Sequence, residues 1–279
     1  MRWCTGLSLP AIVIALGASV VSAQETTSRL TGLAGENDAL VWQAVGRLDA
    51  DESGFCTATL IAPDFVLTAA HCVFAPQTGE ILATEDLTFR AGLRNGSVAA
   101  ERAISQIEAH PRYRPGTGVS AENIRYDVAL LRLAKPIPTH VLDPFLVESR
   151  EISPGPVSVV SYGRGRAEMP SRQRVCQMTD QRQGVLLLDC NVTFGSSGAP
   201  VFSHENGRGR IVSVISGMGV YDGRKVAYGM SLPQVVADLK RQMRANASRP
   251  AAAVKRVTVG TRVLPEGGNG AKFVRPGGS

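Results

Sequence analysis

Short β-prone runs separated by turn residues are the feature of this 279-residue chain that most restricts its fold. Runs of β-branched or alternating apolar and polar residues occur at 40–48, 64–70, 127–133, 156–163 and 210–219. Gly, Pro, Asn and Asp gather between these runs, as they do at tight turns. Many short strands with this punctuation predict an all-β sandwich or barrel.

A single stretch near the carboxyl end has helical periodicity. It begins around Pro233, which suits the first turn of a helix, and continues through "QVVADLKRQMRA". Val235, Val236, Leu239 and Met243 recur at the spacing of one helix face. The sequence therefore predicts one C-terminal amphipathic helix on an otherwise β-rich chain.

The first residues are typical of a secretory signal peptide. Arg2 precedes an apolar run at 7–21, and Val21-Ser22-Ala23 supplies small residues at the usual cleavage spacing before Gln24. A buried helix or a membrane anchor is the alternative, but the run is short for a membrane span and polar residues follow it at once. We expect a signal peptide at 1–23, a secreted or periplasmic protein, and no membrane anchor.

Four cysteines remain after removal of the signal peptide, and an even number in an exported chain suggests two disulfides. Cys56, Cys72, Cys176 and Cys190 allow three connectivities. Sequential pairing would close two short loops, each contributing about 3 kcal/mol in the chain-entropy model, and we expect it because Cys56 and Cys72 flank one strand and turn. A metal site is the rival explanation, but the spacings are not CxxC, so no metal is expected.

Charge and composition restrict the partners. The formal net charge is +6, but arginines are scattered without long runs or interleaved aromatic residues, so no nucleic-acid partner is expected. Residues 247–279 are rich in Gly, Pro, Ala and basic residues, which predicts a flexible basic tail with one candidate strand at 254–259.

Three residues can together perform nucleophilic hydrolysis. His71 follows an apolar strand, Asp127 precedes another, and Ser197 lies on the glycine-lined turn "GSSGAP". Each alone has an ordinary explanation: a surface histidine, a strand-start cap and a loop serine. Together they supply a nucleophile, a base and an acid that orients the base.

These motifs resemble those of the trypsin-like (chymotrypsin-fold) serine proteases, across about 40–245. "TAAHC" matches the family's histidine motif letter for letter, "YDVALLRL" is similar to its Asp-Ile-Ala-Leu-Leu motif, and "GSSGAP" differs from Gly-Asp-Ser-Gly-Gly-Pro at two positions. "VWQAVGRL", "AHPRY" and "VVSYGRG" add weaker likenesses. An α/β-hydrolase is excluded, because its elbow needs Gly-x-Ser-x-Gly and its order is Ser, Asp, His.

The resemblance implies two six-stranded antiparallel β-barrels with a C-terminal helix, in a peptidase domain at 40–246 whose lobes meet near 140–155. Residues 24–39 would be an N-terminal extension or propeptide. The resemblance also assigns Ser197 as nucleophile, His71 as general base and acid, and Asp127 as its orienting partner. The N–H groups of Gly195 and Ser197 would form the oxyanion hole.

Ser196 departs from the family pattern. Animal members carry Asp at this position, and its carboxylate pairs with an N-terminal ammonium released by activation cleavage. A serine hydroxyl cannot form that ion pair, so the chain resembles instead the bacterial branch, which includes glutamyl endopeptidases and HtrA proteases. We expect other contacts to hold the loop, and activity to be independent of a free N-terminus. Too little chain follows Ala245 to expect the PDZ domain of an HtrA protease.

The resemblance places the substrate pocket at Asn191, Val214, Ser216 and Gly217. Asn191 at its floor carries no charge, so a strict Arg/Lys preference is not expected, although Asp189 lies two residues away. No other histidine lies where glutamyl-specific members place one. We therefore expect cleavage after a neutral, small or medium residue.

The sequence predicts a monomeric secreted serine endopeptidase that acts on proteins or peptides and needs no cofactor. A catalytically idle, protease-like binding protein is the alternative. Its usual mark is a missing triad residue, and none is missing here.

Overall fold

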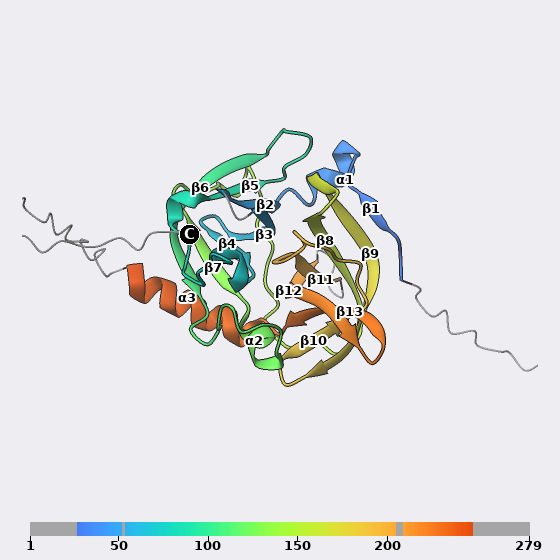
Figure 1. Cartoon of the computed structure of the whole chain (residues 1–279). Helices are drawn as coiled ribbons and strands as arrows, with labels where there is room; N and C mark the ends of the chain where they lie inside the picture. Colours follow the sequence, from blue (N-terminus) through green and yellow to red (C-terminus); the bar gives the residue numbers. More distant parts are fainter. Residues whose placement is uncertain (1–26, 52–53, 205–208, 248–279) are drawn as a thin grey trace, which may run out of the picture.

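The computed structural model describes residues 27–51, 54–204 and 209–247. The expected signal peptide and the candidate strand at 254–259 lie outside these ranges, as does all of the expected tail except residue 247. Figure 1 shows two β-barrels side by side, with one long helix along the first. In the described residues, no helix combines the length and apolar character needed to cross a membrane.

The first barrel closes in the order β2-β3-β4-β7-β6-β5, with every pair antiparallel. Apolar residues point inward along the strands and form one buried core with the C-terminal helix. The strands are β2 (Val45–Ala50), β3 (Gly54–Ala62), β4 (Phe65–Thr68), β5 (Leu87–Ala91), β6 (Ala100–Ala109) and β7 (Ala129–Leu133). Short 3₁₀ turns lie at η2 (Ala70–Val73) and η3 (Thr84–Asp86).

The second barrel closes because β8 pairs with both β11 and β9. A short extra strand, β1 (Leu30–Gly32), pairs with the edge of β9. The six strands of the barrel are β8 (Gly155–Gly163), β9 (Arg166–Arg182), β10 (Val185–Leu188), β11 (Pro200–Ser203), β12 (Arg210–Tyr221) and β13 (Arg224–Met230). The expected architecture of two six-stranded antiparallel barrels is confirmed.

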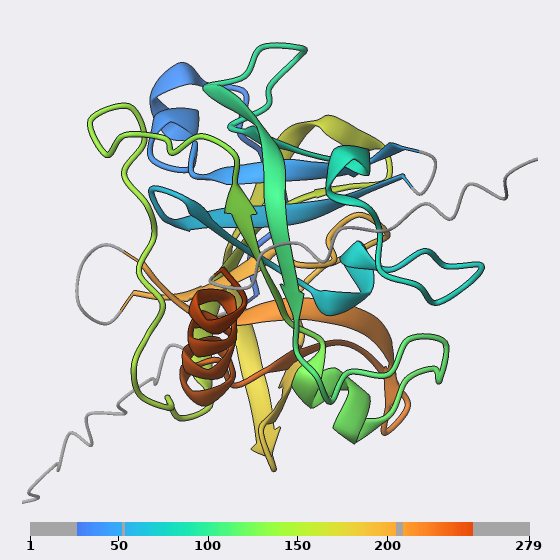
Figure 2. The same ribbon diagram turned by 90° about the vertical axis from the view of Figure 1, so that its left-hand side faces the viewer.

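The C-terminal helix α3 (Pro233–Ala247) follows the second barrel in sequence but packs against β6 and β7 of the first (Figure 2). Val235, Val236, Leu239 and Met243 are its buried residues, which confirms the predicted face. Near its end, the amides of Gln242 and Asn246 donate to the buried Glu108 carboxylate on β6.

Two short helices were not expected from the sequence. The predicted strand at 40–48 is wrong in its first half: α1 (Glu36–Leu40) ends there, a turn follows, and the strand starts at Val45. Trp42 in this turn stacks on Phe145 and meets Phe202 edge-to-face, which explains the apolar character of the stretch. The second helix, α2 (Ala121–Tyr126), is capped by the Ser120 hydroxyl, which accepts from Asn123 N–H at 3.1 Å.

Candidate active site

His71, Asp127 and Ser197 are brought to the region where the two barrels meet. His71 lies in η2 directly after β4, and Asp127 lies between α2 and β7, so both belong to the first barrel. Ser197 lies in the loop between β10 and β11 of the second barrel. His71 and Ser197 line one cleft of about 600 Å³.

The Asp127 carboxylate is buried and its hydrogen bonds are aimed at His71. Oδ2 contacts His71 Nδ1 at 2.8 Å, and Oδ1 accepts from the backbone N–H of His71 at 2.8 Å. The Ser216 hydroxyl also donates to Oδ2, at 2.6 Å. These three bonds fix the carboxylate, and the carboxylate in turn favours the tautomer of His71 that carries its proton on Nδ1.

The electrostatics of His71 follow from this contact. Burial acts to lower the pKa of the imidazole, but the charge of Asp127 and its hydrogen bond more than offset that effect, so the pKa of His71 is raised. The ring is nevertheless 34 % exposed, so it remains accessible from the cleft.

A tight turn presents the backbone beside Ser197. Ser196 N–H donates to the Thr193 carbonyl at 2.9 Å, and Gly195, the third residue of this turn, has a φ of +88°. A type II turn requires a positive φ at that position. A Cβ at Gly195 would also overlap the ring of Phe55, so both the conformation and the space favour glycine.

The turn is oriented by a hydrogen bond to the β8–β9 hairpin. Arg164 N–H donates to the Phe194 carbonyl at 2.8 Å. Because the C=O and N–H of a trans peptide point in opposite directions, the N–H of Gly195 points away from Arg164. Within the described ranges, neither Gly195 N–H nor Ser197 N–H donates to another backbone group. Both are therefore candidate donors to an anionic oxygen.

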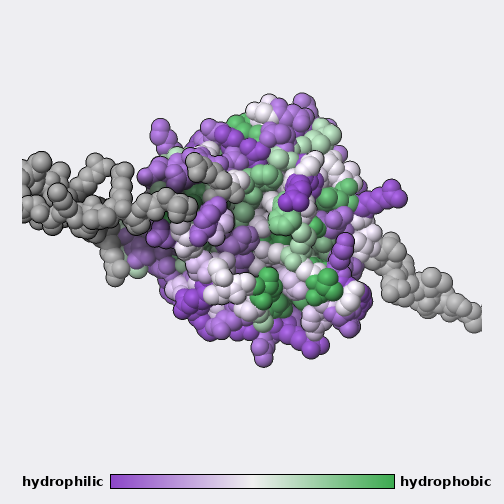
Figure 3. All heavy atoms as spheres, viewed as in Figure 1, coloured by the Kyte–Doolittle hydropathy of each residue, from purple (hydrophilic) through white to green (hydrophobic). Residues whose placement is uncertain are grey.

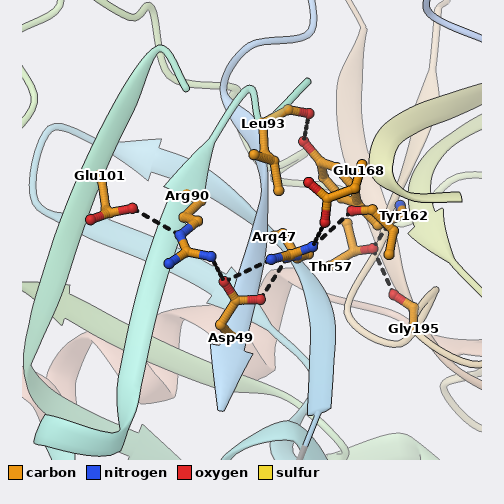
Figure 4. A network of polar contacts seen from close by, with 10 residues as sticks. Arg47, Asp49, Thr57, Arg90, Leu93, Glu101, Tyr162, Glu168 and Gly195 are labelled. Carbon is orange, nitrogen blue, oxygen red and sulfur yellow. Dashed lines mark hydrogen bonds and ion pairs between the residues drawn. The ribbon is translucent and has the colours of Figure 1, made fainter. Parts of the chain in front are cut away.

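Thr57 on β3 fastens this loop to the first barrel, and the sequence analysis missed it. Its hydroxyl donates to the Gly195 carbonyl at 2.8 Å and accepts from Tyr162 N–H at 3.0 Å, while its own N–H donates to the Ser197 carbonyl at 2.8 Å. Figure 4 shows Thr57 and Gly195 facing one another across the two barrels.

An ion-pair network lies beside this contact. Arg47 on β2 reaches Asp49 at 2.6 Å on its own strand and Glu168 on β9 at 2.6 Å (Figure 4). Arg90 extends the network from Asp49 to Glu101, at 2.7 and 2.8 Å. Arg47 therefore links the first barrel to the hairpin that carries Arg164.

Both disulfides pair sequentially, as expected. Cys56–Cys72 joins β3 to the turn that carries His71, and Cys176–Cys190 joins β9 to the segment before Asn191. Cys56, His71 and Cys72 bring potential metal ligands together, as do Cys176, Asp189 and Cys190. All four sulfurs are bonded in disulfides, so they do not offer thiolate ligands to a metal.

Two clefts flank the site. The larger one has aromatic and aliphatic walls that include Phe55, Phe74 and Phe194. The smaller one, of about 420 Å³, runs past His71 and Asp127 to Gly217 and Tyr228. Figure 3 shows apolar patches interrupting the hydrophilic surface in the middle of the face seen in Figure 1.

The expected pocket residues are not gathered into one pocket. Ser216 and Gly217 line the smaller cleft, but Val214 is fully buried in the core. Asn191 is exposed, lines neither cleft, and donates its N–H to Gln173 Oε1 at 2.7 Å. Tyr228 and the 61 % exposed Phe194 are cleft residues that the sequence analysis did not single out.

Comparisons with known proteins agree with this architecture. A family model described as "Trypsin-like peptidase domain" matches residues 53–212, which is more than half of the chain. The chain therefore belongs to the trypsin-like peptidase domain family.

Two curated relatives match shorter stretches. "Transmembrane protease serine 9" of Rattus norvegicus is 29 % identical over 106 residues, or 38 % of this chain and 9 % of that protein. "Vitamin K-dependent protein C" of Mus musculus is 38 % identical over 99 residues, or 34 % of this chain and 18 % of that protein. The match thus spans less than a fifth of either relative's length.

A solved structure titled "Structure of Glu endopeptidase in complex with MPD" shares the fold. It superposes with a TM-score of 0.63 at 15 % identity, covering 79 % of this chain and 98 % of that one.

Proposed function

We propose that this chain is a secreted serine endopeptidase that hydrolyses peptide bonds through an acyl-enzyme formed on Ser197. The observation that carries the proposal is the buried Asp127 carboxylate, which bonds both the ring and the backbone of His71 beside Ser197. A histidine held in this way can accept a proton on Nε2, while Asp127 stabilises the imidazolium that results.

In the first step, the Ser197 hydroxyl attacks the substrate carbonyl carbon and its proton passes to His71. The carbonyl oxygen becomes an oxyanion, for which the N–H groups of Gly195 and Ser197 are the proposed donors. His71 then returns the proton to the departing amine as the C–N bond breaks, which leaves the acyl group on Ser197. Water gives up a proton to His71 and attacks this ester; the bond between the acyl carbon and Ser197 Oγ breaks, His71 returns the proton to Ser197 Oγ, and the carboxylic acid product is released.

The two clefts are the proposed binding sites for the peptide on either side of the scissile bond. The larger, aromatic cleft suits apolar side chains, because its walls offer rings and the Cys56–Cys72 disulfide. Glutamate specificity is not carried over from the structural neighbour, since its 15 % identity supports the fold alone.

A fluorophosphonate probe read out by intact mass tests the proposal. Wild-type protein should gain one probe mass and Ser197→Ala none. Ser196→Ala should still be labelled, although more slowly, because Ser196 is bonded within the turn and is buried. Labelling of folded Ser197→Ala together with loss of labelling in Ser196→Ala would show that the assignment is wrong. An unlabelled, inactive wild type would favour the idle binding protein.

A further inference from the structure

The guanidinium of Arg166 lies directly behind the turn that carries Gly195. Arg166 is the first residue of β9, and its Nη2 donates to Ser196 Oγ at 3.0 Å and to Ser161 Oγ at 2.9 Å. Its Nη1 donates to the Ser161 carbonyl. One side chain thus ties the β8–β9 hairpin to the loop between β10 and β11.

The hydroxyl of Ser196 uses its entire hydrogen-bonding capacity within the protein. Its hydroxyl accepts from Arg166 and from Thr193 N–H at 3.2 Å, and it donates to the Tyr162 carbonyl at 3.0 Å. A hydroxyl has one donor and two acceptor positions, so none is left over. The side chain is completely buried, and water does not compete for these bonds.

Close packing transmits the position of Arg166 to Gly195. A Cβ at Gly163 would lie 2.9 Å from Arg166 Nη2 and 2.7 Å from Thr193 Cγ2, so the guanidinium lies against a bare Cα. Gly163 Cα is also 3.2 Å from where a Cβ of Gly195 would be, so Gly163 lies close to both the guanidinium and Gly195. A shift of the guanidinium would therefore displace the turn.

The positive charge of Arg166 has no carboxylate beside it within the described ranges. Burial lowers the pKa of Arg166 to about 10, so the group remains charged at neutral pH. A half-buried charge without a counterion is costly, and packing alone would be served as well by an apolar side chain. An uncompensated positive charge bonded to the turn would stabilise negative charge that develops at the turn.

We propose that Arg166 is a positioning residue for catalysis: through Ser196 it holds the 193–196 turn so that Gly195 N–H faces the developing oxyanion. Its uncompensated charge further stabilises that oxyanion. This inference rests on the proposed peptidase function.

The test compares Arg166→Met, Arg166→Lys and a matched control, Arg172→Met. Arg172 is a second half-buried arginine on β9, packed over Trp42 and lining neither cleft at the active site. On one fluorogenic peptide selected with the wild type, Arg166→Met should lower kcat about 100-fold, the scale for loss of an oxyanion donor, with KM changed less than about threefold. Arg166→Lys should keep part of kcat, and Arg172→Met should resemble the wild type.

A second readout separates positioning from general damage. A peptide boronate forms a tetrahedral anionic adduct on the serine, whereas the matching peptide amide binds without one. Arg166→Met should weaken boronate binding by about the same factor as kcat and leave amide binding unchanged. A variant that is merely loosened would lose affinity for both.

The inference is overturned if folded Arg166→Met, checked by its melting temperature, keeps kcat within about twofold of the wild type. It is also overturned if the loss appears in KM alone. If Arg166→Met does not fold, Ser196→Ala removes the same contact from the other side, and an unchanged kcat there contradicts the proposal. A wild type that neither reacts with a fluorophosphonate nor cleaves any peptide contradicts the peptidase function itself.

Discussion

Thr57, on the first barrel, donates a hydrogen bond of 2.8 Å to the carbonyl oxygen of Gly195, on the second. This bond joins the barrel that carries His71 and Asp127 to the loop that carries Ser197. Because the Gly195 carbonyl is bonded to Thr57 and the Phe194 carbonyl to Arg164, both peptide groups that flank Gly195 have little freedom to rotate. The geometry of the site thus depends on the interface between the barrels.

Replacing Thr57 by valine should therefore reduce both stability and turnover. The change removes a hydroxyl and leaves Gly195 C=O and Tyr162 N–H without their partner, which costs about 2 kcal/mol in the free energy of unfolding. Urea denaturation and kcat on one peptide would measure the two effects, and Thr57→Ser should restore most of both.

Thr59, two residues along the same strand, supplies the control. It is equally buried, but its hydroxyl has no hydrogen-bond partner among the residues described. Thr59→Val should leave the free energy of unfolding unchanged or raise it. Equal losses in both valine variants would show that the effect comes from β3 and not from the bond to Gly195.

The pH dependence of activity should have its acid limb above pH 6.5. His71 acts as a base only when neutral, and Asp127 raises its pKa, so kcat/KM should fall as pH decreases through that raised value. The midpoint of the acid limb, taken from kcat/KM measured between pH 5 and 9, gives the pKa of His71 in the free enzyme.

Removing the charge of Asp127 should lower the pKa of His71. NMR titration of the histidine rings in Asp127→Asn should show a lower pKa for His71 than in the wild type. His204 is an internal reference, because burial and Arg172 lower its pKa in both proteins. An unchanged His71 titration in Asp127→Asn would mean that the carboxylate does not set it.

The Cys56–Cys72 disulfide should stabilise the part of the first barrel that carries His71. It closes a sequence separation of 16 residues, so replacing both cysteines by serine should lower the free energy of unfolding by about 3 kcal/mol. Non-reduced peptide mapping of the wild type should find only sequential pairs. Cross-linked peptides between the two barrels, or a double variant as stable as the wild type, would contradict this expectation.

Activity should not require a defined free N-terminus. Ser196 bonds to Arg166, which comes from the body of the second barrel, and it has no carboxylate to receive an ammonium. Chains beginning at Gln24 with and without an added Gly-Ser should therefore agree in kcat/KM within about twofold. Activity that appears only with one particular free amino group would refute this prediction.

The sequence alone predicted the elements whose pattern is local. The helix face at Val235 and Met243 follows from periodicity, and the strand after Asp127 follows from an unbroken apolar run. The prediction of a strand at 40–48 was wrong in its first half because Trp42 and Val45 are apolar for different reasons. Trp42 lies in a turn and fills an aromatic cluster, whereas Val45 begins a strand.

The site residues also fall into those that local motifs predicted and those that they did not. The resemblance supplied His71, Asp127 and Ser197 from short motifs. It placed Asn191 in the substrate pocket, whereas the structure leaves it exposed outside both clefts. The sequence did not indicate a role for Thr57 or Arg166, because a threonine in a strand and an arginine after a glycine turn are common. Their contacts with Gly195 and Ser196 arise only when segments 138 and 30 residues apart in the sequence meet.

The position of α3 also determines when the first barrel can finish folding during synthesis. The core of the first barrel includes Leu232, Val236, Leu239 and Met243, which are among the last of the described residues to be made. The first barrel therefore cannot complete its core until nearly the whole described chain has been translated. For the same reason, a protease that removed α3 would expose the apolar residues that the helix covers on β6 and β7, and the loss would destabilise the barrel that carries His71 and Asp127.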